Sequence, residues 1–292
     1  MRLIFITGKG GVGKSAVTAA LGTLLALSNK KTGIVELNET RMGDFFNAKP
    51  PSYDGTSVQK NLTLFNLEAK ECFEEYVSRI LPKKFLMLLK NRWVEHFIHA
   101  VPGLNEILLL GKIRSLLQEE GFDTLLIDAP ATGHTVSLCD APRIAMAALK
   151  HGSFKTMVLQ IWEMLHDPQQ TSFLLVTQPE ESIVQETIEL FSYLQDPLKL
   201  HWQGLIVNGV LHRDASMPEN LPNKVPPEAE PLLEILQREN IEFEKQKRSI
   251  QELEKAIPLQ KTTLPWQGFL PEENLLRKNL AEELKLWVSK NF

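Results

Sequence analysis

An apolar run followed by a glycine-rich octet lies at the start of the sequence and constrains the fold more than any other feature. Residues 3–6 are Leu-Ile-Phe-Ile, residues 8–15 are Gly-Lys-Gly-Gly-Val-Gly-Lys-Ser, and good helix formers follow. Glycines let consecutive backbone N–H groups turn toward one anion, and the positive end of the helix dipole adds to their field. A strand, such an octet and a helix are therefore typical of a phosphate-binding loop.

The last two side chains of the octet have distinct expected roles. Lys14 would reach the β- and γ-phosphates of a nucleotide, and the Ser15 hydroxyl would bind Mg²⁺. The predicted cofactors are accordingly ATP and Mg²⁺. Contacts with the nucleotide are expected from the loop and the first helical turn, namely Gly8, Gly10, Gly11, Val12, Gly13, Lys14, Ser15 and Ala16.

Apolar strand-like runs alternate with helical patterns along the whole chain. This alternation predicts an α/β fold with a mostly parallel central sheet and helices on both faces. We expect one domain over residues 1–292, with a mostly helical insertion around 68–120 and a short helical segment around 152–166. Strands are predicted at 3–7, 33–37, 62–67, 124–128, 173–177, 204–207 and near 257–264, and helices at 15–27, 182–194, 234–256 and from 272.

Composition excludes several classes of partner. The formal net charge of −4 comes without a basic stripe, so we expect no nucleic-acid partner. Cys72 and Cys139 lie far apart with no C-x-x-C, which argues against a cysteine zinc site and against a disulfide framework. We expect no leader segment, because the sequence begins with an apolar strand, and no apolar run reaches bilayer length, so a soluble cytoplasmic protein is expected.

A second motif begins with the apolar strand 124–128, which ends in Asp128. A carboxylate at the carboxyl end of a parallel strand lies where open α/β sheets bind their ligands. Asp128 is therefore a predicted catalytic and metal-site residue, holding Mg²⁺ through water together with Ser15. The segment 128–135 continues as Asp-Ala-Pro-Ala-Thr-Gly-His-Thr, and we interpret His134 as part of a switch loop and not as a proton acceptor.

These two motifs resemble those of ArsA-type ATPases. The octet with its early lysine, Lys9, is similar to the variant phosphate loop shared by MinD, the nitrogenase iron protein and ArsA, and segment 128–135 looks like the ArsA switch II. The segments 102–106 and 179–187 are also similar to family patterns. The resemblance implies an ATPase in which Lys9 crosses a dimer interface to the partner's nucleotide, rather like an arginine finger supplied in trans.

The same resemblance implies further partners and contacts. Asn208 matches the strand-end residue that recognises adenine, while Pro265 and Pro271 fall where the family closes the base pocket. The protein would be a homodimer, or a heterodimer with a paralogous ArsA-like subunit, that couples ATP binding and hydrolysis to a membrane-protein client or partner. The apolar residues within 152–166 and 85–98 could line a client groove, but this spacing is more often core.

Switch I departs from the family pattern. Asn38 stands at or next to the position where the family has a water-orienting Asp, and an amide cannot accept a proton as a carboxylate does. Glu36, Glu39 or Asp44 could substitute, and Glu39 at the strand end is the preferred candidate. Asn38 and Glu39 are therefore both candidate catalytic residues. The alternative is a non-hydrolysing nucleotide-binding subunit that partners a paralogous ATPase.

Overall fold

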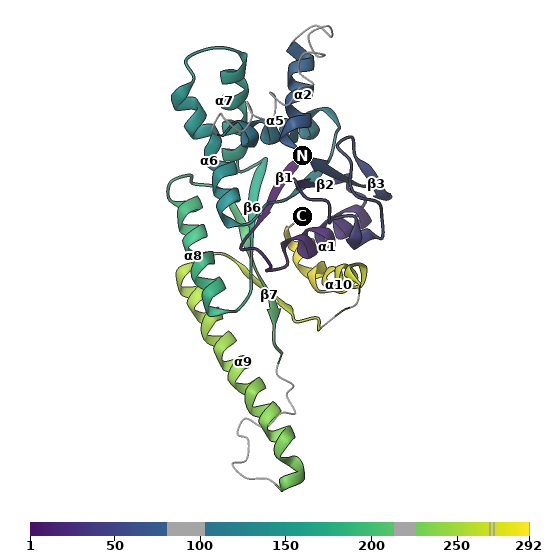
Figure 1. The fold of residues 1–292 in the computed structure, drawn as a ribbon, viewed down its shortest axis with the longest axis vertical. Helices are drawn as coiled ribbons and strands as arrows, with labels where there is room; N and C mark the ends of the chain where they lie inside the picture. The colour runs from purple at the N-terminus through teal and green to yellow at the C-terminus, as the bar shows by residue number, and fades with distance from the viewer. Residues whose placement is uncertain (81–102, 213–225, 269, 271, 292) are drawn as a thin grey trace.

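The computed structural model describes residues 1–80, 103–212, 226–268, 270 and 272–291. Figure 1 labels its helices and strands in chain order. The strands are β1 (Arg2–Thr7), β2 (Thr32–Leu37), β3 (Thr56–Gln59), β4 (Leu62–Leu67), β5 (Thr124–Asp128), β6 (Thr171–Thr177), β7 (Trp202–Val210) and β8 (Lys261–Pro265). The helices are α1 (Lys14–Leu27), α2 (Ala69–Ile80), α5 (Leu104–Glu119), α6 (Thr132–Ala148), α7 (Ser153–His166), α8 (Glu181–Gln195), α9 (Glu230–Ala256) and α10 (Glu273–Asn291), with short 3₁₀ turns at η1 (Asp44–Phe46) and η2 (Pro227–Ala229).

The described strands form one sheet in the order β3-β4-β2-β5-β1-β6-β7-β8. All neighbouring strands run parallel except β3, which pairs antiparallel with β4 at the edge. This arrangement confirms the predicted α/β class. Because β1 lies between β5 and β6, the glycine-rich loop that follows β1 emerges at the centre of the carboxyl edge, between the ends of two neighbouring strands.

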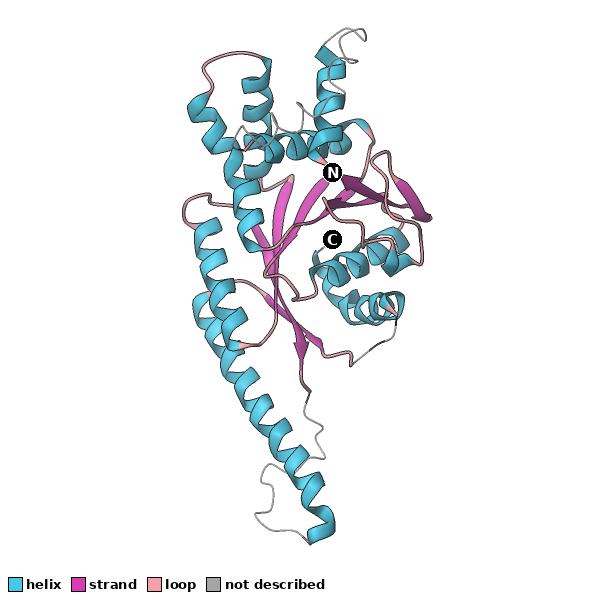
Figure 2. Ribbon diagram, viewed as in Figure 1, coloured by secondary structure: helices cyan, strands magenta, loops and turns pink. Residues whose placement is uncertain are grey.

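Helices cover both faces of the sheet (Figure 2). Along β1, Ile4 and Ile6 join the core beneath α1 and α10, whereas Leu3 and Phe5 join the core beneath α5, α6, α7 and α8. The alternation follows from the pleat, which sends successive side chains to opposite faces. Since both faces are covered, every residue of β2 and β5 is buried.

The C-terminal helix α10 packs along α1 and closes one side of the loop region (Figure 1). The buried guanidinium of Arg277 donates hydrogen bonds to the carbonyl oxygen of Phe45 at 2.9 Å and to Thr23 Oγ1 at 2.6 Å. One side chain of α10 thereby joins the segment after β2 to the helix after the glycine-rich loop.

The apolar residues of α7 mainly form core. Ile161, Met164 and Leu165 are buried, and Leu159 is 41% exposed. The similar apolar stretch at 85–98 lies outside the described residues. Among the helices that the structure describes, none combines the length and hydropathy needed to cross a bilayer.

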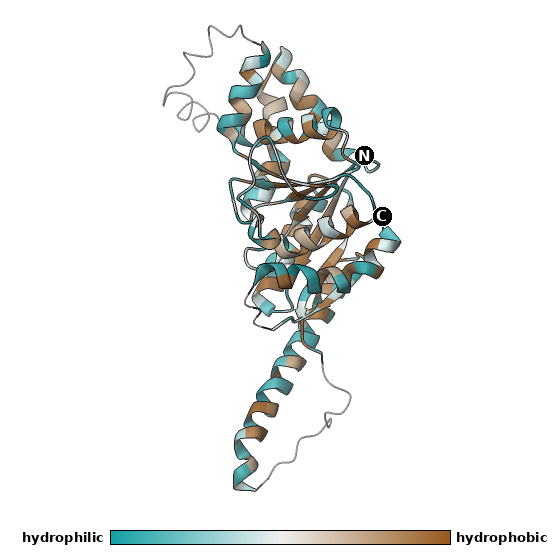
Figure 3. Ribbon diagram, turned by 90° about the vertical axis from the view of Figure 1, so that its right-hand side faces the viewer, coloured by the Kyte–Doolittle hydropathy of each residue, from teal (hydrophilic) through white to brown (hydrophobic). Residues whose placement is uncertain are grey.

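Three local features differ from the sequence-based expectations. The edge strand β3 was not predicted, because it is short and half exposed. Helix α9 begins at Glu230, before the expected start at 234, and its outer half projects beyond the sheet (Figure 3). Helix α6 was not predicted, and His134, expected in a switch loop, lies in its first turn.

Candidate functional site

Two glycines allow the loop after β1 to turn tightly. Gly8 has a φ of 150°, and a Cβ there would lie 2.0 Å from the carbonyl oxygen of Val176. Gly13 has a φ of 92°, and a Cβ there would lie 2.4 Å from Asn208 Nδ2. Only glycine tolerates both the positive φ and the close approach. The loop therefore presses against the ends of β6 and β7 and leads directly into α1.

The predicted phosphate and metal residues lie close together. The Ser15 hydroxyl donates a hydrogen bond to Asp128 Oδ2 at 2.6 Å, and Lys14 Nζ donates to the carbonyl oxygen of Lys9 at 3.0 Å. Thr18, which sequence analysis did not select, lies one turn after Ser15 with its hydroxyl 3.4 Å from Asp128 Oδ1. Sequence analysis could have selected Thr18, because a hydroxyl three residues after Ser15 lies on the same face of the helix.

A cavity of about 430 Å³ opens in front of these groups at the carboxyl edge of the sheet. Its wall combines the glycine-rich loop, the ends of β2 and β5, the segment after β2, and α10. The lining residues are Gly10, Gly11, Gly13, Lys14, Ser15, Ala16, Glu36, Leu37, Glu39, Arg41, Phe45, Asp128, Ala129, Pro130, Ala131, Glu273 and Leu276. Of these, Arg41, Glu273 and Leu276 carried no local motif that sequence analysis could have used.

The charges around this cavity fit a polyphosphate with a divalent cation. Burial raises the pKa of the Asp128 carboxyl to about 6, partly opposed by Ser15 and Lys14, and burial lowers the pKa of Lys14. A cation at Asp128 would remove the cost of keeping this buried carboxylate charged. The oxygen set of Ser15 and Asp128 suits Mg²⁺, which takes few carboxylates and keeps several waters.

Glu36 is the least exposed acidic residue of the cavity wall, at 1%. Its Oε1 accepts the backbone N–H groups of Arg41 at 3.0 Å and of Met42 at 2.9 Å. Burial raises its pKa to about 7, and the nearby carboxylates of Asp128 and Glu39 act in the same direction. Through these two hydrogen bonds, Glu36 holds the segment that follows β2 against the end of that strand.

The two predicted switch I residues have different positions. Glu39 is exposed and lines the cavity. Asn38 adopts a φ of 57°, its backbone N–H donates to the carbonyl oxygen of Leu67 at 3.1 Å, and it is not among the lining residues. The turn at Asn38 therefore directs Glu39, and not the amide, toward the cavity.

The early lysine of the loop forms an ion pair within its own chain. Lys9 Nζ lies 2.6 Å from Glu186 Oε1 on α8. Both side chains are partly exposed. Lys9 is not among the residues that line the phosphate cavity.

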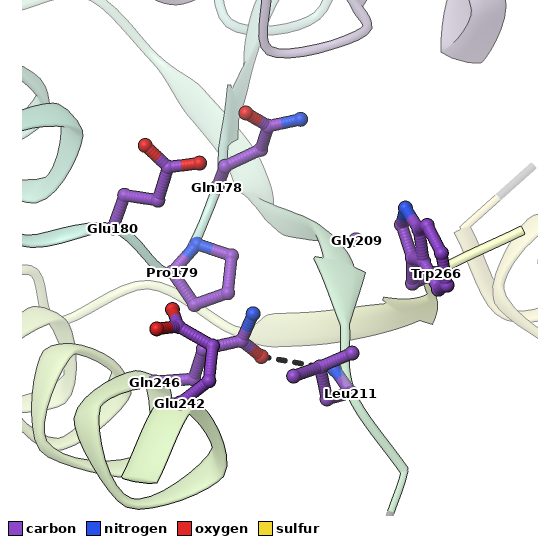
Figure 4. A pocket seen from close by; sticks show the side chains of 8 residues that line it. All are labelled: Gln178, Pro179, Glu180, Gly209, Leu211, Glu242, Gln246 and Trp266. Carbon is purple, nitrogen blue, oxygen red and sulfur yellow. Dashed lines mark hydrogen bonds between the residues drawn. The ribbon is translucent and has the colours of Figure 1, made fainter. Parts of the chain in front are cut away.

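A second cavity of about 240 Å³ lies on the β7 side of the loop (Figure 4). Figure 4 shows the side chains of Gln178 and Trp266 on two sides of Gly209. Asn208, the predicted base contact, precedes Gly209 but is not among the residues that line this cavity, and its Nδ2 donates to the carbonyl oxygen of Val12 at 2.9 Å. Pro265 lies at the end of β8, in register with Val210, and Pro271 lies outside the described residues.

A glycine-rich loop between a central parallel strand and a helix, with Ser15 bonded to an aspartate on the adjacent strand, defines the class of P-loop nucleotide-binding proteins. The family model described as anion-transporting ATPase matches residues 1–161 and 147–225. The chain belongs to this family of ATPases.

Individual relatives agree with this assignment. The ATPase BagA of Mycobacterium tuberculosis is 31% identical over 225 residues, which are 71% of this chain and 65% of that protein. An arsenical pump-driving ATPase of Acidiphilium multivorum is 29% identical over 72% of this chain and 35% of its own length. A relative from Halobacterium salinarum is 27% identical over 81% of this chain and 40% of its own length. The chain thus spans less than two thirds of each of these relatives.

Proposed function

We propose that this chain hydrolyses ATP as one subunit of a dimeric switch. The observation that supports this most directly is the cavity of about 430 Å³, because Lys14, Ser15 and Asp128 meet at its wall. Its position at the carboxyl edge of a parallel sheet, in front of a helix N-terminus, is suited to a triphosphate. Lys14 would leave the carbonyl oxygen of Lys9 and bind the β- and γ-phosphates.

Hydrolysis requires little covalent participation by the protein. A water oxygen forms a bond to the γ-phosphorus while the bond to the bridging oxygen breaks, giving ADP and inorganic phosphate with release of a proton. The loop N–H groups and Lys14 stabilise the charge of the phosphoryl oxygens, and Glu39 would orient the water. Mg²⁺ held by Ser15 and Asp128 would neutralise the phosphate charge.

The nucleotide base would occupy the cavity beside Gly209. Asn208 donates its amide hydrogen to Val12, so its Oδ1 can accept from the exocyclic amino group of adenine. Trp266 offers an aromatic face and Gln178 an amide at the same cavity. Pro265 and Pro271 would complete the wall near the end of β8.

The proposed dimer sandwiches nucleotide between two copies, or between this chain and a paralogous subunit. Lys9 would leave Glu186 and reach the nucleotide of the partner subunit. Closing and reopening of the dimer would change how it binds a membrane-protein client or partner. We place this activity in the cytoplasm. In this proposal the chain works as a single ATPase domain over residues 1–292, with a mostly helical insertion around 68–120 and a short helical segment around 152–166.

A second candidate is a nucleotide-binding subunit without its own turnover. Asn38 favours this candidate. It stands at or next to the position of the family's switch I Asp, its side chain is an amide, and it is not among the residues that line the cavity. In that case a paralogous partner would supply hydrolysis. Purified protein that binds ATP without turnover and gains turnover with the paralog would support this candidate.

Steady-state ATP hydrolysis by the purified chain tests the proposal. We expect Mg²⁺-dependent turnover in the wild type that is lost in Lys14→Ala and in Asp128→Asn. Lys60→Ala removes an exposed lysine at the β3–β4 turn and is the matched control. Nucleotide binding without turnover, at every Mg²⁺ concentration tried, would favour the second candidate instead.

A further inference from the structure

We infer that Arg41 is a catalytic residue that acts on the γ-phosphate bound by its own subunit. The inference rests on the proposed ATPase function and adds to it a cation that no local motif had indicated. Arg41 lines the phosphate cavity together with Lys14 and Ser15 of the same chain. A guanidinium at this wall would reach a triphosphate whose β-phosphate sits in the loop.

The backbone of Arg41 is fixed in place. Its N–H donates to Glu36 Oε1 at 3.0 Å, and the next N–H, from Met42, donates to the same oxygen at 2.9 Å. Glu36 is 1% exposed and Met42 is fully buried, so both anchors belong to the interior. The start of the Arg41 side chain is therefore held at the cavity, and only the rest of it has to move when a ligand binds.

The guanidinium of Arg41 is available to a ligand. Within the described ranges it forms no ion pair or hydrogen bond, although the carboxyl groups of Glu39 and Glu273 line the same cavity. The residue is exposed to solvent at the cavity wall. A guanidinium presents donors in a planar fork that matches two oxygens of one phosphate group, so Arg41 can bind a γ-phosphate at this wall.

The side-chain charges of the cavity also single out Arg41. Among the lining residues that the structure describes, the acidic side chains are those of Glu36, Glu39, Asp128 and Glu273, and the basic ones are those of Lys14 and Arg41. Besides the proposed Mg²⁺ and the loop N–H groups, Arg41 is therefore the only basic side chain other than Lys14 that the described lining offers to a triphosphate. A positioned cation that meets the charge of the transferring phosphoryl group is the main source of catalysis in this chemistry.

The role of Arg41 in the reaction follows from its chemistry. As the water oxygen bonds to the γ-phosphorus, the electron pair of the breaking bond moves to the bridging oxygen of ADP. The Arg41 guanidinium donates hydrogen bonds to the γ-phosphate oxygens throughout and transfers no proton. The proton from the water leaves with the phosphate and solvent. Glu36 is a positioning residue, since it acts on the phosphate only through the backbone of Arg41.

The first experiment compares wild type, Arg41→Ala and Arg41→Lys, with Arg238→Ala on the exposed face of α9 as matched control. We expect kcat to fall by about 10²-fold or more in Arg41→Ala, with a smaller fall in Arg41→Lys, because one preorganised donor to a developing anion contributes on the order of 10²–10³-fold. ADP affinity should change by less than about threefold. Trapping of ADP with aluminium fluoride and Mg²⁺ should be lost in Arg41→Ala and kept in Arg238→Ala.

A second measurement does not depend on turnover. If the wild type hydrolyses no ATP, the proposed ATPase function fails, and Arg41 is tested by equilibrium binding of ATPγS and ADP. We expect Arg41→Ala to weaken ATPγS binding by about tenfold while ADP binding stays unchanged, since only the triphosphate meets the guanidinium. Equal losses for both nucleotides, or wild-type trapping and turnover in Arg41→Ala, would overturn the inference. Arg41→Lys serves as the test variant if Arg41→Ala does not fold.

Discussion

Lys9 Nζ lies 2.6 Å from Glu186 Oε1, so the lysine proposed to serve the partner's nucleotide is paired inside its own subunit. The pair joins the glycine-rich loop to α8. A closed dimer in which Lys9 crosses the interface must break this contact. The ion pair therefore favours the open arrangement of the proposed switch.

Replacing Glu186 with Gln should shift the nucleotide-bound protein toward the closed dimer. Each pair contributes only about 0.2–1 kcal/mol, because both side chains are partly exposed. Since a homodimer contains two such pairs, we expect its dissociation constant in the presence of ATP to fall by about two- to 30-fold, as measured by analytical ultracentrifugation. Glu189→Gln, one turn further along α8, is the control. Weaker dimerisation in Glu186→Gln would mean that Glu186 is needed in the closed state.

Mixed dimers can show which nucleotide Lys9 serves. Lys9→Ala and Lys14→Ala homodimers should both be inactive. If Lys9 acts across the interface, a dimer with one subunit of each kind has one complete site and about half of the wild-type rate. A dimer of wild type with the Lys9→Ala, Lys14→Ala double variant is the control, and it should be inactive. The reverse pattern of activities would place Lys9 at its own subunit's nucleotide.

Glu39 should be the carboxylate that orients the attacking water. It is exposed at the cavity wall, whereas the Oε1 of Glu36 already holds two backbone N–H groups and Asn38 is turned out of the lining. We expect Glu39→Gln to lower kcat by about 10²-fold with little change in KM, the usual scale for losing a general base. Asn38→Ala should keep most of the rate. A normal kcat in Glu39→Gln would remove Glu39 from this role.

The buried carboxyl of Glu36 should make stability depend on pH in the absence of nucleotide. Its folded pKa of about 7 lies above the unfolded value of 4.5, so the folded protein binds a proton that the unfolded chain releases. The stabilisation that depends on this proton is fully present below about pH 4.5, and it is lost as the pH rises through about 7. The loss amounts to about 3 kcal/mol, from ~1.4 kcal/mol per pKa unit.

Urea unfolding of the wild type and Glu36→Gln between pH 5 and 8 measures this contribution. As pH rises, the free energy of unfolding of the wild type should fall relative to that of Glu36→Gln, because the amide stays neutral and buries no charge. Asp128 and Glu39 face Glu36 and are present in both proteins, so the difference reports Glu36 together with its coupling to these two carboxyl groups. A difference that does not vary with pH would show that Glu36 titrates normally.

Sequence reasoning located the parts of the site whose geometry is local. Gly8 to Ser15 form one continuous turn, and Asp128 ends a strand adjacent to β1, so spacing and apolar pattern were enough. Arg41 was not found because its place depends on two hydrogen bonds that fold the segment after β2 back onto Glu36. The packing of α10 beside the site could not be predicted from the sequence either, because Arg277 and Thr23 come together only in the folded chain.

The last prediction concerns the cavity beside Gly209, the proposed adenine site. Trp266 follows β8, its backbone N–H donates to the carbonyl oxygen of Val210 at 2.9 Å, and its ring lines the cavity beside Gly209. An aromatic ring stacked on a base contributes about 1–3 kcal/mol, so Trp266→Ala should raise the KM for ATP by about tenfold or more while kcat changes little. Trp266→Phe should restore most of the affinity, and binding of inorganic tripolyphosphate, which has no base, should be the same in all three proteins. An unchanged KM in Trp266→Ala, or an equal loss of tripolyphosphate binding, would place the adenine elsewhere, because a residue that contacts only the base cannot alter binding of the phosphate chain alone.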